Sequence, residues 1–109
     1  AAERLQVHSR ESLAQRIAHY HCELADAALA ARHCEQAAES VRAALAIDPR
    51  SARARLTDAR ITLQQGQTLR ALDALSAAAG VDASVIPEAL VLWWRAYADV
   101  EYRQAARAT

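Results

Sequence analysis

Residues 35–66 read EQAAESVRAALAIDPRSARARLTDARITLQQG, and this stretch contains the boundary between two predicted helices. Its first half has apolar residues at i, i+4, i+7 and i+8, a spacing that predicts a helix over 35–47 with one buried stripe. The stripe consists of Ala37, Val41, Ala44 and Leu45. Asp48-Pro49 ends this helix, because proline disfavours helical geometry in the residue before it.

The next predicted helix covers 51–65. Ser51 can cap its first turn with the side-chain oxygen. Gly66 follows its last turn, where a left-handed residue commonly ends a helix. The other predicted helices cover 17–31, 68–79 and a segment that begins within 84–87. Gly80 is expected to stop the helix over 68–79.

A period of 34 residues relates the predicted helices to one another. Three pairs of small or apolar residues stand 34 positions apart: Ala25 and Ala59, Ala37 and Ala71, Val41 and Leu75. A helix–turn–helix unit of this length is typical of the tetratricopeptide repeat (TPR), which the chain therefore resembles. We expect an all-α fold, a TPR-type α-solenoid of antiparallel helix pairs with about two and a half repeats.

The whole chain, 1–109, is predicted to be a single solenoid segment. Its parts are the end of a preceding helix at 1–8, a first repeat at 17–49, a second repeat at 51–80 and a partial third repeat at 84–109. The third repeat fits only with about one residue inserted between Gly80 and Pro87.

Three residues depart from the TPR pattern. Arg32 stands in the first intra-repeat turn where Gly is usual, Thr68 where Tyr usually opens the second helix, and Asp58 where a large apolar residue is usual. We expect Asp58 to pair with a nearby arginine such as Arg55, since an unpaired buried carboxylate is costly.

The composition favours an all-helical protein. Apolar residues make up 53% of the 109 residues but aromatics only 5%, and two Gly and two Pro leave few turns for a β-fold. Thirteen basic and thirteen acidic residues balance, so we expect no general attraction for nucleic acid or a membrane surface. Two cysteines suit a reducing compartment, and the sequence shows neither a membrane-spanning run nor a signal-peptide pattern, which predicts a cytoplasmic location.

The run Ile17-Ala18-His19-Tyr20-His21-Cys22-Glu23-Leu24-Ala25 resembles the TPR region of the LapB (YciM) family. Ala37, Asp48-Pro49, Ser51-Ala52-Arg53 and Gly66 follow in a compatible register. The resemblance implies a bacterial inner-membrane protein with an N-terminal anchor, a cytoplasmic TPR array and a rubredoxin-like metal domain. Such proteins are adaptors between a membrane-bound AAA protease and the lipid A deacetylase, in the control of lipopolysaccharide synthesis.

The sequence has neither that anchor nor a Cys-x-x-Cys motif, so only the scaffold role is carried over. We therefore expect a non-enzymatic module that binds other proteins or peptides. One alternative is the non-catalytic TPR portion of an N-acetylglucosaminyl glycosyltransferase, because TPR arrays precede the catalytic region of some glycosyltransferases. Another is a self-association module that forms a homodimer through exposed solenoid ends.

The inner, concave surface of a TPR array is lined by the first helix of each repeat, and ligand peptides normally lie there. The residues expected to bind a partner on this surface are His19, Cys22, Asp26, Arg53, Leu56, Arg60 and Arg95, with Leu29, Leu63, Glu88 and Val91 beside them. Arg53 and Arg60 stack on one helix face, where guanidinium groups suit an acidic peptide. The alternative is a solvated face in which these arginines pair with Asp26, Asp58 or Glu88.

The adjacent tryptophans Trp93 and Trp94 are a candidate interface. They lie about 100° apart around a helix, so both cannot face the same neighbour. One is expected in the core. The other is expected at an interface with a following repeat or a second copy.

Five possible metal ligands, His19, His21, Cys22, His33 and Cys34, do not predict a metal site. His33 and Cys34 lie about 16 Å further along the helix axis than the others, so four tetrahedral ligands do not assemble. The same distance argues against a disulfide. The sequence has no phosphate-binding loop, nucleophile elbow or paired catalytic carboxylates, so neither a cofactor nor a catalytic residue is expected.

Overall fold

The computed structural model describes residues 2–108, and the side chains of residues 13–108. It contains five α-helices and a short 3₁₀ turn: α1 (Ala2–Ala30), α2 (Cys34–Ile47), α3 (Ala52–Gln64), α4 (Thr68–Val81), η1 (Ala83–Val85) and α5 (Ile86–Ala108). No strand occurs among the described residues. The predicted all-helical class is confirmed.

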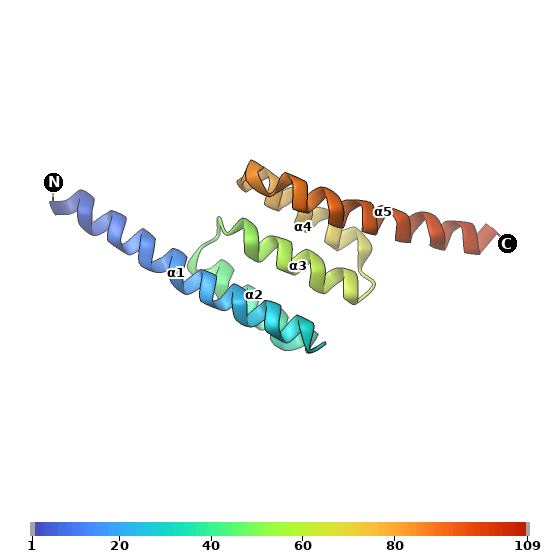
Figure 1. Cartoon of the computed structure of the whole chain (residues 1–109), viewed down its shortest axis with the longest axis horizontal. Helices are drawn as coiled ribbons and strands as arrows, with labels where there is room; N and C mark the ends of the chain where they lie inside the picture. Colours follow the sequence, from blue (N-terminus) through green and yellow to red (C-terminus); the bar gives the residue numbers. More distant parts are fainter. Residues whose placement is uncertain (1, 109) are drawn as a thin grey trace.

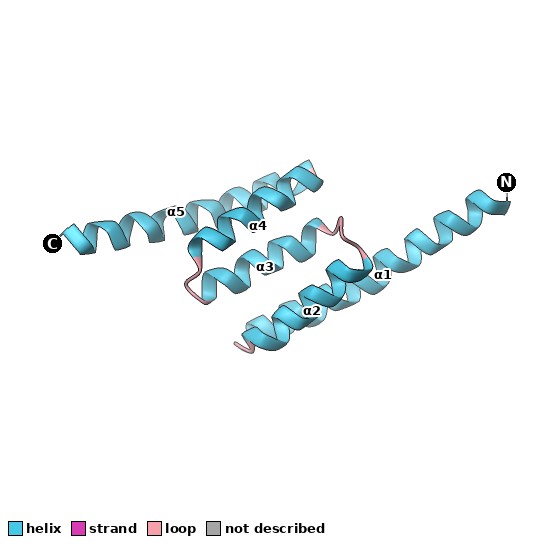
Figure 2. Ribbon diagram, turned by 180° about the vertical axis from the view of Figure 1, so that it is seen from behind, coloured by secondary structure: helices cyan, strands magenta, loops and turns pink. Residues whose placement is uncertain are grey.

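The helices form two layers. Figure 1 shows α1, α3 and α5 side by side in one layer, with α2 and α4 behind them, and Figure 2 shows the same two layers from the other side. Each of α2 and α4 folds back against the helix before it through a short turn. The ends of α1 and α5 project from opposite sides of this body, and the whole molecule with these ends measures 67 × 27 × 17 Å.

The two helix hairpins have the same turn, 34 residues apart. In α1–α2 the amide of His33 donates to the Ala28 carbonyl at 2.8 Å, and in α3–α4 the amide of Gln67 donates to the Thr62 carbonyl at 2.8 Å. The residue before each of these amides is left-handed: Arg32 has φ 63° and Gly66 has φ 75°. A 34-residue repeat is therefore present in the backbone geometry as well as in the sequence.

Local signals explain where α3 and α4 begin and end. The Ser51 hydroxyl accepts a hydrogen bond from the Ala54 amide at 3.1 Å, which confirms the predicted cap. The expected stop at Gly80 is wrong by two residues, because Gly80 lies within α4, which continues to Val81. The helix ends instead at Asp82, which is extended and accepts a hydrogen bond from the Ser84 amide at 3.0 Å. Hydrogen bonding from Ser84, first by its side chain and then by its amide, lowers the pKa of Asp82.

The terminal helices are longer than the repeat pattern predicts. The expected separate helix over 1–8 is not found from residue 2 on, since α1 is unbroken from Ala2 to Ala30. The physical reason is that no Gly or Pro lies between His8 and Ile17 to end a helix. Likewise α5 continues past Glu101, where a turn equivalent to the one at Gly66 would fall.

Small residues at the helix crossings build the core. Alanines with no exposed surface lie where the helices pack closely: Ala25, Ala37, Ala44, Ala54, Ala59, Ala71, Ala78 and Ala96. Larger side chains fill the space between them, with Ile61 beside the α1–α2 hairpin and Leu75 between α3, α4 and α5. This packing fixes which side of each helix remains open to solvent.

Candidate protein-interaction surfaces

Asp26 joins the first two helices of the α1–α3–α5 layer. Its carboxylate accepts a hydrogen bond from Arg53 Nη2 at 2.9 Å and another from the Thr57 hydroxyl at 3.0 Å. The bond from Arg53, together with the carboxylate's charge, raises the pKa of the Arg53 guanidinium. Arg53 Nη1 also donates to His19 Nδ1 at 3.2 Å, so His19 Nε2 carries the proton and faces Glu23 Oε1 at 3.0 Å.

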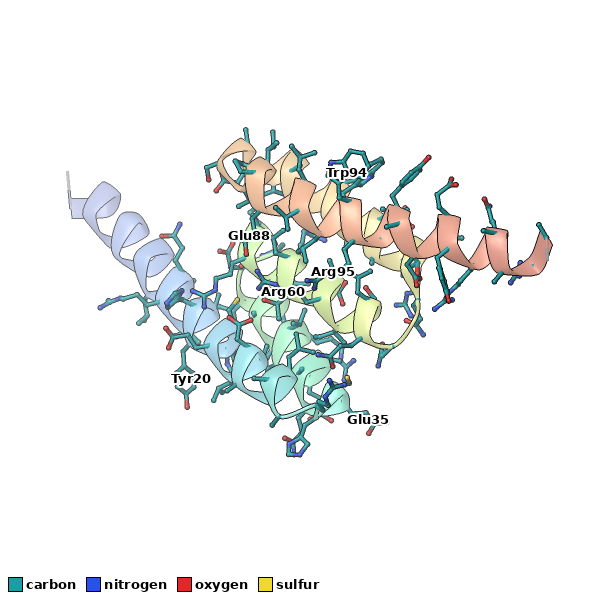
Figure 3. The ribbon with its side chains drawn as sticks, turned by 45° about the vertical axis from the view of Figure 1, so that its right-hand side comes forward. Tyr20, Glu35, Arg60, Glu88, Trp94 and Arg95 are labelled. Carbon is teal, nitrogen blue, oxygen red and sulfur yellow. The ribbon has the colours of Figure 1, made fainter. Side chains whose placement is uncertain are left out.

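A second ion pair of the same kind joins α3 to α5. Arg60 pairs with Glu88, and Figure 3 shows Arg60, Glu88 and Arg95 gathered on one side of these helices. The partners are 28 residues apart, against 27 for Asp26 and Arg53, which agrees with one inserted residue in the third repeat. The two pairs place their charges in opposite order along the chain. Asp26 precedes Arg53, whereas Glu88 follows Arg60.

We call the surface that carries Asp26, Arg53, Arg60 and Glu88 the ion-pair face. The predicted basic stripe is smaller than expected there, since Arg53 and Arg60 already have carboxylate partners within the chain. Arg95 is exposed and has no carboxylate partner among the side chains that the structure describes. The alternative of arginines paired with Asp26 and Glu88 is the one observed.

Three residues predicted on this surface are buried. Cys22 is 1% exposed and packs with Ala18, Ala44 and Ala54, while Leu29 and Leu56 also lie in the core. The three prediction errors have one cause: these side chains lie on the sides of α1 and α3 that meet neighbouring helices. Burial also raises the pKa of the Cys22 thiol, which keeps it protonated and unreactive.

Asp58 does not pair as predicted. It is half-buried, and burial raises the pKa of its carboxyl group. The expected partner Arg55 donates instead from Nη2 to the Pro49 carbonyl at 3.0 Å, and its buried Nε has no hydrogen-bond partner. Asp58 lines a hollow of about 550 Å³ between α2, α3 and the start of α4, together with Arg70.

The aromatic residues of α5 lie on its outer side. Trp93 stacks on Tyr97 with ring centres 5.3 Å apart, and Trp94 meets both rings edge-on. Trp94 is 63% exposed and points away from α3 (Figure 3). The prediction that one tryptophan is buried is wrong, because Ala89, Leu92 and Ala96 occupy the inward positions.

A crease between α4 and α5 adjoins these rings, and sequence reasoning missed it. One hollow of about 240 Å³ lies between Ser76 and Ala79 of α4 and Leu90 and Trp93 of α5. Another, of about 540 Å³, lies where the start of α4 faces Val100 to Arg107. The signal that could have found it is an apolar run at alternating spacings of four and three residues: Ile86, Leu90, Trp93, Tyr97 and Val100.

A second apolar stripe lies on the outer side of α1. Its members recur at helical spacing and are all exposed: Leu13, Ile17, Tyr20 and Leu24. Figure 3 shows Tyr20 on the side of α1 away from α3. The two outermost helices of the layer therefore both present large apolar side chains to solvent.

Other kinds of site find little support in the described part of the chain. No three His, Cys, Asp or Glu side chains converge there on a point where a metal ion could bind. Both cysteines are unpaired thiols. None of the described helices combines the length and apolar character needed to cross a bilayer.

Fold and surface together define an all-helical protein of two matched hairpins and a fifth helix, with apolar outer edges. No family model, curated protein or solved structure matches the chain.

Proposed function

We propose that this chain is a TPR-type repeat module that holds other proteins and performs no chemistry itself. The observation that carries the proposal is the pair of exposed apolar edges, on α1 and on α5. Water-exposed apolar side chains in a contiguous row are costly in a soluble protein and commonly mark interaction surfaces. Their position on long, regular helices suits binding to a helix or a folded surface.

The repeat geometry supports the TPR part of the proposal. Two hairpins share their turn, their small crossing residues and their 34-residue offset. In repeat proteins each unit packs mainly against its neighbours, and the stacked units form an extended surface for partners. The layer of α1, α3 and α5 supplies such a surface here, with the ion-pair face along it (Figure 1).

The edges are favoured over the ion-pair face as the main binding surface. An acidic peptide on the ion-pair face would have to compete with Asp26 and Glu88 for Arg53 and Arg60. Among the described arginines of that face, Arg95 alone has no carboxylate partner. Apolar contacts at the edges displace only water. The ion-pair face then affects the choice of partner through Arg95 and contributes little to affinity.

The biological setting is a narrower proposal, which rests on the resemblance of 17–25 to the LapB family. It places the module in the cytoplasm as an adaptor in the control of lipopolysaccharide synthesis. Deletion of the gene should then change the level of the lipid A deacetylase, measured by immunoblotting. An unchanged deacetylase in a strain whose gene also encodes a glycosyltransferase domain would favour the alternative setting.

The experiment that tests the binding role compares edge variants in affinity capture followed by calorimetry with the captured protein. Tyr20→Glu changes the α1 edge and Trp94→Glu the α5 edge, at positions 58% and 63% exposed. Glu39→Lys on α2 is the control, since it reverses a charge at an exposed position outside both edges. We expect at least one edge variant to lose a partner that the control keeps, with helicity unchanged by circular dichroism. Equal capture by all three variants would contradict the proposal.

A further inference from the structure

We propose that α5 pairs antiparallel with α5 of a second copy of this chain, in a register that sets Trp93 of each copy against Tyr97 of the other. The inference rests on the proposed function, and it names the occupant of one of the two edges. It leaves the α1 edge and the ion-pair face available to other proteins.

The apolar stripe of α5 has the spacing that a partner helix requires. Ile86, Leu90, Trp93, Tyr97 and Val100 alternate at four and three residues, so they lie along one side of the helix for about 21 Å. Packing of a second helix against such a 4-3 stripe gives knobs-into-holes contact at a shallow crossing angle. The hollows along the α4–α5 crease give room for side chains of that helix.

The stripe is complementary to itself when reversed. In an antiparallel pair centred between Trp93 and Tyr97, Leu90 lies opposite Val100 of the second copy, and each Trp93 lies opposite a Tyr97. Every contact then occurs twice, as a two-fold axis requires. The positions in the middle are all aromatic or aliphatic, and the polar Gln104 falls at the rim opposite Ile86.

Charges at the two ends of α5 favour the same antiparallel register. Arg70, Arg103 and Arg107 line the C-terminal end of the crease. The same end of α5 carries two carboxylates, those of Asp99 and the exposed Glu101. Asp99 Oδ2 forms an ion pair with Arg103 Nε at 3.3 Å and accepts a hydrogen bond from the Thr68 hydroxyl at 2.9 Å. Arg107 has no carboxylate partner among the described side chains.

The other end of α5 supplies the opposite charge. Asp82 is exposed just before η1, and its carboxylate is negatively charged at neutral pH, as expected of an exposed aspartate. In the proposed register Arg107 of one copy lies within about one residue of Asp82 of the other. A parallel pair would bring the Arg103 and Arg107 ends together, where like charges repel.

Disulfide trapping tests the register directly, in the chain with Cys34→Ser so that only engineered thiols are accessible. The double variant Leu90→Cys, Val100→Cys should form a covalent dimer on mild oxidation. Leu90→Cys alone should stay monomeric, since residues 90 of the two copies would be about 15 Å apart along the axis. The same spacing prevents a bridge between 90 and 100 within one chain.

Sedimentation provides the second measurement. We expect the native chain to form a reversible dimer. The dissociation constant of that dimer should rise at least tenfold in Tyr97→Glu and stay the same in Tyr20→Glu. Charge reversal in Arg107→Glu should weaken the dimer, and adding Asp82→Arg should restore it. Trp93 lies in this interface and Trp94 packs edge-on against it, so tryptophan emission should shift to the blue as the dimer forms.

A monomer at all concentrations, or equal trapping by the single and double cysteine variants, would overturn the inference. If the chain is monomeric and Trp94→Glu still abolishes capture of another protein, the α5 edge binds that protein and the proposed function stands. If it dimerises as described but no edge variant loses a partner, the proposed function fails and the inference stands.

Discussion

Asp26 accepts hydrogen bonds from two side chains of α3, one charged and one neutral. The Thr57 hydroxyl has no exposed surface, so removing the carboxylate leaves a buried donor unsatisfied. We expect Asp26→Ala to lower the free energy of unfolding by about 1–3 kcal/mol, measured by urea denaturation. Glu88→Ala removes the partner of Arg60 from an exposed ion pair. This variant should change the free energy of unfolding by less than about 0.5 kcal/mol. Equal losses in the two variants would contradict this reading of the ion-pair face.

Arg32 and Gly66 occupy equivalent turns with the same left-handed backbone. A side chain in that conformation is strained, so Arg32→Gly should stabilise the chain by about 0.5–1 kcal/mol. Gly66→Ala should destabilise it by a similar amount, because a Cβ there would also lie 3.3 Å from Arg103 Nη2. Thermal unfolding of both variants measures the two effects, and a loss of stability in Arg32→Gly would show that the Arg32 side chain has a role of its own.

Burial raises the pKa of Asp58 above its usual value of 3.8, with opposing contributions from Arg70 and Arg55. The folded state therefore binds this proton more tightly than the unfolded state does. The contribution of Asp58 to the free energy of unfolding therefore falls as the pH rises from 3.8 through the folded-state pKa. Above that pKa the contribution is constant. Asp58→Asn should be more stable than the native chain at pH 7, and the difference should shrink as the pH is lowered through that window. Denaturation across a pH series checks this, with the exposed Asp73→Asn as control. A difference that grows on acidification would contradict it.

At the scale of the helices, close approach depends on small residues at the crossings. Ala59 has no exposed surface and packs with Leu56, Ala71 and Leu75. Ala59→Leu should cost about 1–3 kcal/mol through overpacking, whereas Ala46→Leu on the exposed side of α2 should be nearly neutral. Chemical denaturation compares the two variants. A tolerated leucine at position 59 would mean that α3 and α4 are not in close contact.

Helix positions followed from the sequence where a local signal was strong. Ser51 and Gly66 each act through their own backbone neighbourhood, and both were predicted correctly. The prediction that α4 ends at Gly80 was wrong, because glycine permits a helix end without requiring one. Asp82 ends α4 instead. The length of α1 was missed because a break was expected from the repeat pattern alone, although nothing between His8 and Ile17 interrupts a helix.

At the scale of the whole molecule, the candidate surface was only partly predictable. Spacing along one helix correctly placed Arg53 and Arg60 on one side of α3, but it could not show that α1 and α5 supply their partners. Cys22 and Leu56 were misplaced for the same reason, since burial depends on helices that are distant in sequence. The open sides of α1 and α5 are likewise a property of the assembled layers.

Site-specific photo-crosslinking tests the central claim, that the chain holds other proteins through its apolar edges. A crosslinking residue would replace Tyr20, Trp94 or, as control, Glu39 in the protein made in its own cells. The account predicts discrete adducts with another protein from position 20, adducts from position 94 that include one of twice the chain mass, and none from position 39. Background-level labelling from both edges, or equal adducts from position 39, would contradict it.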